Sequence, residues 1–134
     1  MNENCPNEVI ELLVTRCLLL RQTHILRNSI NTSYQCTPLH YYLARKSSVD
    51  LEVVKLLINA WPEANQIRNI RGHMPIHTLC YNEQMDEAVS LDVLRFMHNT
   101  DRTLLRKNME GWLPIHLAVG HMSTAFCKEL INGF

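Results

Sequence analysis

The stretch that decides the fold is "GHMPIHTLC", residues 72–80, because it occurs three times in variant form. "CTPLHYYLA" begins at Cys36, and "WLPIHLAVG" begins at Trp112. A recurrence of this kind is typical of proteins built from stacked repeats, which share one continuous core. The three copies are anchored by prolines spaced 37 and 39 residues apart: Pro38, Pro75 and Pro114.

Each unit predicts a short helix, a loop and a longer helix. The short helix begins at the proline, whose missing N–H would have no partner in the first turn. "LEVVKLLINA" from Leu51 and "LDVLRFMHN" from Leu91 predict the longer helices, since their apolar residues recur at helical spacing. We expect Asp50 and Ser90 to be their N-caps. The pair Trp61–Pro62 should end the first of them.

The two ends of the chain predict further helices. Residues 7–22 are apolar around most of a helical circumference, which indicates a buried helix. "STAFCKELINGF", residues 123–134, predicts a last helix. With no following unit, its apolar side chains should face outward, so we expect this end either to continue into further repeats or to pack on another chain. Those side chains are Phe126, Leu130, Ile131 and Phe134.

The recurring segments resemble the ankyrin repeat family. The resemblance is carried by nine residues: Thr37, Pro38, His40, Gly72, Pro75, His77, Gly111, Pro114 and His116. It implies an all-α fold, an α-solenoid of stacked helix–loop–helix repeats. The expected units are an N-terminal capping helix or degenerate repeat at 1–29, repeats at 30–69 and 70–108, and a third, truncated or complete, at 109–134. Both spacings exceed the family period of about 33 residues, because the loops between paired helices are long.

Composition restricts the class of partner. The formal net charge is +0 and the pI is about 7.0, which argues against nucleic acid or an anionic membrane. The longest apolar run, residues 17–20, cannot span a bilayer, and no signal peptide is apparent. The five cysteines lack a CxxC pattern, which favours reduced thiols in an intracellular protein, cytoplasmic or nuclear.

The sequence gives little support for a catalytic or metal-binding site. His77 and Cys80 lie three residues apart on one predicted helix, but a metal would need two further ligands. A Cys–His catalytic pair would need an oxyanion hole, which no motif suggests. Phosphate-binding and hydrolase motifs are absent from the sequence. We therefore predict no catalytic residue, no metal and no cofactor, and the resemblance implies that the three repeated histidines are structural.

The remaining role is binding to another protein. The resemblance implies a concave surface formed by loop tips and short helices. The matching positions are Tyr34, Arg45, Ile70, Arg71, His73, Tyr81, Asn82, Met109, Glu110, Trp112 and His121. Tyr81 and Trp112 could instead pack on a neighbouring loop or helix. The sequence predicts a non-enzymatic protein–protein interaction module. The alternative is a regulatory or targeting segment of a larger enzyme whose catalytic domain lies beyond residue 134.

Overall fold

The computed structural model describes residues 36–45, 49–106 and 110–133. The helix expected at 7–22, and the candidate binding residues Tyr34 and Met109, lie outside these ranges. Within them the chain forms six α-helices and two short 3-10 helices. The α-helices are α2 (Pro38–Ala44), α3 (Leu51–Ala60), α4 (Pro75–Tyr81), α5 (Glu87–Thr100), α6 (Pro114–His121) and α7 (Thr124–Gly133). The 3-10 helices are η2 (Pro62–Gln66) and η3 (Leu104–Arg106).

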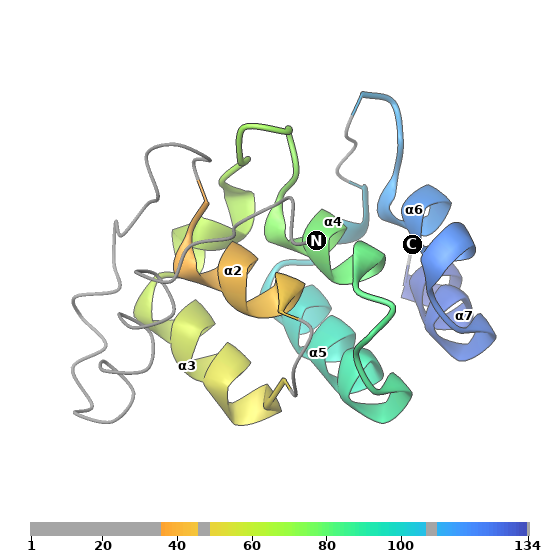
Figure 1. The fold of residues 1–134 in the computed structure, drawn as a ribbon, viewed down its shortest axis with the longest axis horizontal. Coiled ribbons are helices and arrows are strands. Elements are labelled where there is room, and N and C mark those ends of the chain that lie inside the picture. Colours follow the sequence, from red (N-terminus) through yellow and green to blue (C-terminus); the bar gives the residue numbers. More distant parts are fainter. Residues whose placement is uncertain (1–35, 46–48, 107–109, 134) are drawn as a thin grey trace.

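The helices form two parallel rows, as Figure 1 shows. The short helices α2, α4 and α6 pack side by side in one row, and the longer helices α3, α5 and α7 pack in the other. Each short helix also contacts the longer helix that follows it. The loops that precede α4 and α6 project on the same side of the molecule. The predicted all-α solenoid of helix pairs is therefore confirmed.

Each short helix begins in the same way. Its proline occupies the first turn, and the histidine two residues later turns its ring back toward the helix start. There the ring Nδ1 atom accepts a hydrogen bond from the backbone N–H of the residue before the proline. This bond satisfies one of the donors that a helix N-terminus leaves without an intrahelical partner. The bond occurs at Thr37–His40 (3.2 Å), Met74–His77 (3.0 Å) and Leu113–His116 (2.9 Å). A threonine before the proline is therefore not required.

Two side chains join the first helix pair to the second. His40 donates from Nε2 to the backbone oxygen of His73 at 2.8 Å. Asn82 donates from Nδ2 to the carbonyl of Leu43 (2.8 Å), in the last turn of α2, and to that of Arg45 (2.9 Å), just after the helix. Both donors are buried. Asn82 thereby satisfies carbonyls at the end of α2, whereas the His73 oxygen bonded by His40 also accepts the Asn69 N–H at 2.8 Å.

The core corrects two expectations for the longer helices. Phe126 and Leu130 do not face outward, because both are buried where α7 packs on α5 and α6. Only Ile131, which is 62% exposed, faces outward among the described members of that group. Helix α5 also starts one turn before the expected cap at Ser90. The carboxylate of Asp86 caps it by accepting the N–H groups of Ala88 (3.1 Å) and Val89 (3.3 Å).

Other local expectations agree with the structure. Asp50 caps α3 by accepting the N–H of Glu52 at 2.9 Å. Helix α3 ends at Ala60, and Pro62 starts η2. Cys80 and Cys127 are free thiols as expected, whereas Cys36 differs from expectation because it takes part in a disulfide. None of the described helices is long and apolar enough to cross a membrane.

Candidate partner-binding groove

A shallow groove of about 280 Å³ lies between α4, α6 and the loop that leads into α6. Its lining residues are Tyr81, Glu110, Trp112, His116, Leu117, Gly120 and His121. Tyr81, Glu110, Trp112 and His121 are residues that the sequence placed on a binding surface. The structure brings these four together from the end of α4, the loop tip and the end of α6. We call this surface the groove.

Four of the seven residues that line the groove have aromatic rings. The Tyr81 ring stacks on His73, with centroids 5.2 Å apart, and meets His121 edge-on at 4.9 Å. Trp112 meets His116 edge-on, with centroids 5.7 Å apart and ring planes at 85°. Trp112 is nevertheless 54% exposed. These contacts limit the ring orientations, so less conformational freedom is lost when a partner binds.

The loop geometry explains how Trp112 reaches this position. Glu110 and Gly111 both have positive φ, at 53° and 88°, so the chain reverses sharply before Trp112. This conformation costs glycine little, whereas most other residues adopt it rarely. The equivalent turn before α4 has φ 81° at Gly72. There Asn69 supports the turn, because its side-chain oxygen accepts the N–H groups of Arg71 and His73, both at 3.0 Å.

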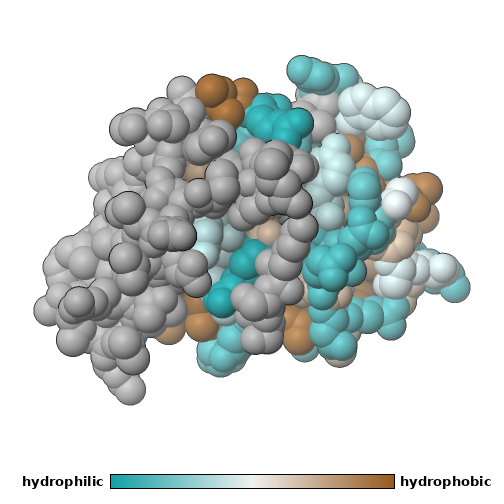
Figure 2. Space-filling view, in the orientation of Figure 1, coloured by the Kyte–Doolittle hydropathy of each residue, from teal (hydrophilic) through white to brown (hydrophobic). Residues whose placement is uncertain are grey.

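The charge around the groove is negative. Glu110 lines it directly, and the Glu83 carboxylate contacts His121 with 3.3 Å between Oε1 and Nδ1. No lysine or arginine of the described ranges lines the groove. Figure 2 shows that hydrophobic residues form only small separate patches on the described part of the face in view. The groove thus combines aromatic surface with carboxylates.

The family comparison identifies the architecture. Residues 34–70 match the family model described as Ankyrin repeat. This chain contains an ankyrin repeat. No significant match was found among curated proteins or among solved structures. The match covers the first helix pair, and the pairs α4–α5 and α6–α7 repeat its proline–histidine start.

The other predicted surface residues of the ankyrin repeats do not line the groove. Ile70 and Arg71 are exposed at the tip of the preceding loop. Arg45 is half-buried, with its guanidinium 5.1 Å from the centre of the Tyr42 ring. His73 and Asn82 are buried and stabilise the junction between the first two repeats. Burial therefore removes these last two from any surface that a partner could reach.

Sequence reasoning missed three residues of the groove. His116 was assigned only a structural role, yet it is exposed here while also capping its own helix. Its equivalents, His40 and His77, are completely buried by a following repeat. The exposure of His116 could have been predicted, because this residue belongs to the third unit and no described helix pair packs on the outer side of that unit. Nothing comparable in the sequence indicated that Leu117 and Gly120 would line the groove.

The histidine–cysteine pair of the second ankyrin repeat is not arranged for nucleophilic chemistry. Cys80 is completely buried, and burial raises the pKa of its thiol far above the usual range. The reactive form of cysteine is the thiolate, which such burial disfavours. The Nδ1 atom of His77 already accepts the Met74 N–H. Within the described residues, no group of three histidine, cysteine or acidic side chains could hold a metal ion.

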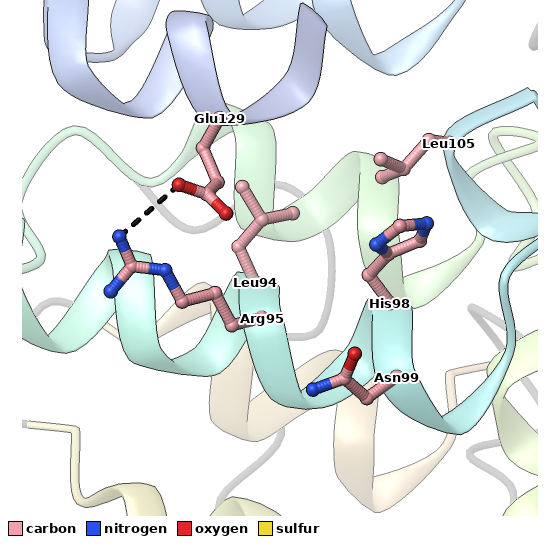
Figure 3. Close-up of a pocket in the computed structure, with 6 residues that line it drawn as sticks. All are labelled: Leu94, Arg95, His98, Asn99, Leu105 and Glu129. Carbon is pink, nitrogen blue, oxygen red and sulfur yellow. Dashed lines mark hydrogen bonds and ion pairs between the residues drawn. The ribbon is translucent and has the colours of Figure 1, made fainter. Parts of the chain in front are cut away.

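A second cavity, of about 260 Å³, lies on the other row of ankyrin helices (Figure 3). Its lining residues are Leu94, Arg95, His98, Asn99, Leu105 and Glu129. Arg95 on α5 donates to Glu129 on α7 at 3.1 Å across its opening. Because both side chains are solvent-exposed, the pair is weak, and its charges compensate each other. This cavity contains none of the aromatic residues that mark a protein interface.

Proposed function

We propose that the chain is a non-enzymatic protein–protein interaction module that holds a partner in the groove. Repeat solenoids use extended concave surfaces of this kind for binding. The observation that carries the proposal is the convergence of Tyr81, Trp112 and His121 in one accessible depression. Tryptophan and tyrosine are the residue types most enriched at interface hot spots.

The proposed contact surface extends from the groove to the preceding loop tip. Ile70 is 59% exposed there, and Arg71 is exposed beside it. An apolar side chain and an arginine near an aromatic groove suit the centre and margin of an interface. For the chain as a whole, we propose the repeat boundaries 30–69, 70–108 and 109–134, with an intracellular location.

The test is quantitative capture of a partner by the full chain and two variants. Trp112→Ala should lower affinity for the captured protein by about five-fold or more, since truncating a hot-spot aromatic costs over 1 kcal/mol. Ile131→Ala is the matched control, because Ile131 is also an exposed apolar residue but lies on α7, away from the groove. Equal capture by the wild-type chain and Trp112→Ala, with unchanged circular dichroism, would rule out the groove.

A further inference from the structure

We infer that the groove binds an arginine side chain of the partner protein. This inference rests on the proposed function and adds the chemistry of the residue recognised. It is carried by the combination, in one depression, of an exposed tryptophan and a carboxylate that has no ion-pair partner among the described residues. Neither feature alone would distinguish an arginine from another side chain.

The carboxylate is that of Glu110. It lines the groove, and no ion pair to it exists within the described residues. Two other glutamates are already compensated, since Glu129 pairs with Arg95 at 3.1 Å and Glu52 with Lys55 at 3.4 Å. Glu83 adds a second negative charge beside the groove through its contact with His121. A cationic ligand would therefore meet an attractive potential there.

The aromatic surface is that of Trp112. Its edge-on contact with His116 holds the indole, while 54% of the residue stays exposed. Tryptophan is the best aromatic partner for a cation placed over its ring. A planar guanidinium can lie on that ring and still donate to a carboxylate, which a compact ammonium does less well. This geometry favours arginine over lysine.

Other ligand types fit the groove less well. An acidic side chain would be repelled by Glu110. A purely apolar side chain would remove water from that carboxylate and provide no donor in exchange, which is costly. The second cavity illustrates the contrast, because Glu129 there already pairs with an arginine of the chain itself. In the groove, no arginine or lysine of the described residues lies among the lining side chains, which leaves this position to an arginine of the partner.

The experiment is a nuclear magnetic resonance titration of the ¹⁵N-labelled full chain with two capped tripeptides. One is acetyl-Gly-Arg-Gly-amide, and the other contains citrulline, which has nearly the same shape without the charge. The arginine peptide should shift the indole N–H of Trp112 and the amide of Gly120 in a saturable manner. The citrulline peptide should bind at least about five-fold more weakly, as expected when the cation–π and ion-pair contributions are lost.

Three variants locate the effect. Glu110→Gln should weaken arginine-peptide binding by about three-fold, the size expected for an exposed ion pair, and Trp112→Ala should remove the Gly120 shift. Glu87→Gln is the matched control, because Glu87 is an exposed glutamate outside the groove. Equal affinity for both peptides, shifts outside the groove, or no shift at millimolar peptide would overturn the inference. If partner capture still depends on Trp112, the proposed function stands and only the arginine site is lost.

Discussion

The first and third repeats show how one sequence motif acquires two environments. His40 and His116 both follow their prolines by two residues, and both accept a backbone N–H at the helix start. His40 is completely buried because α4 and its loop cover it, and its Nε2 bonds to the next repeat. His116 is exposed and lines the groove. The difference comes from the neighbouring repeat.

The same contrast holds at apolar positions. Cys80 is completely buried, whereas Val119, at the same distance from its proline, is 69% exposed. In the longer helices, "LIN" at residues 57–59 recurs at residues 130–132, yet Ile58 is buried and Ile131 is exposed. A position within the repeat therefore determines which way a side chain points. Whether that side chain is covered depends on the following helix pair.

The largest expected effect on stability comes from comparing the buried and exposed faces of α7. Phe126→Ala should lower the free energy of unfolding by about 3 to 5 kcal/mol, because it leaves a cavity in a packed core. Ile131→Ala should change it by less than about 0.5 kcal/mol, because its side chain is mainly in water. Urea denaturation followed by circular dichroism measures both. Similar losses for the two variants would contradict the packing of α7 on α5 and α6.

The buried His40 predicts a pH dependence that comes from the first junction. Burial lowers its pKa in the folded state from 6.5 to about 4, so the unfolded chain binds this proton more readily. The stability gained from neutral His40 is complete above pH 6.5 and is lost as the pH falls toward 4. Between pH 7 and pH 5 the loss should be about 2 kcal/mol.

Urea midpoints measured across that pH range test this expectation. The variant His40→Gln should lose the share of the pH dependence that His40 contributes, about 2 kcal/mol between pH 7 and pH 5, although its stability at pH 7 will be lower. The variant His116→Gln is the control at the equivalent exposed position and should keep the wild-type slope. A wild-type slope in His40→Gln would assign the titration to another group.

An intermediate effect on stability is expected from the hydrogen bonds that join the first two repeats. Asn82→Ala should destabilise the protein by about 2 kcal/mol, because the buried bond to the Leu43 carbonyl and the part-buried bond to the Arg45 carbonyl are both lost. Asn99→Ala, at an exposed position on α5, should cost less than about 0.5 kcal/mol. Chemical denaturation of both variants provides the comparison. Equal values would show that the Asn82 bonds contribute nothing beyond what water supplies.

The smallest expected effects on stability come from substituting two glycines within the third repeat. Gly111 has φ 88°, so Gly111→Ala should destabilise by about 1 kcal/mol even though nothing lies near the added methyl group. Gly120 lies within α6, and its added methyl group would also meet open space. Gly120→Ala should therefore stabilise by about 0.5 to 1 kcal/mol through helix propensity. Thermal melts should show changes of opposite sign.

Local features were predictable to the extent that local physics produces them. The helix starts at the prolines, the cap at Asp50 and the end of α3 at Ala60 follow from residue type alone. The predicted start of α5 was wrong because Asp86 and Ser90 are both residue types that can cap a helix N-terminus. Only the full loop conformation decides which of two such residues the chain uses.

Only part of the groove lining was predictable from the sequence. Tyr81, Glu110, Trp112 and His121 were assigned to one surface from their repeat positions, and all four line it. Asn82 was assigned to the same surface, yet it turns inward to the end of α2. Its counterpart in the third repeat is His121, which contacts Glu83 beside the groove. Equivalent positions thus take opposite roles according to which acceptors lie within reach.

The sequence by itself determined the helix pairs, their order and their stacking as an all-α ankyrin array, because these depend on proline geometry, helical periodicity and a recurring motif. The tertiary structure alone decided which copies of that motif are covered. Burial depends on what packs from outside the repeat, and that information is absent from the repeat itself. For this reason His40 became a buried link between repeats, while His116 became part of the groove.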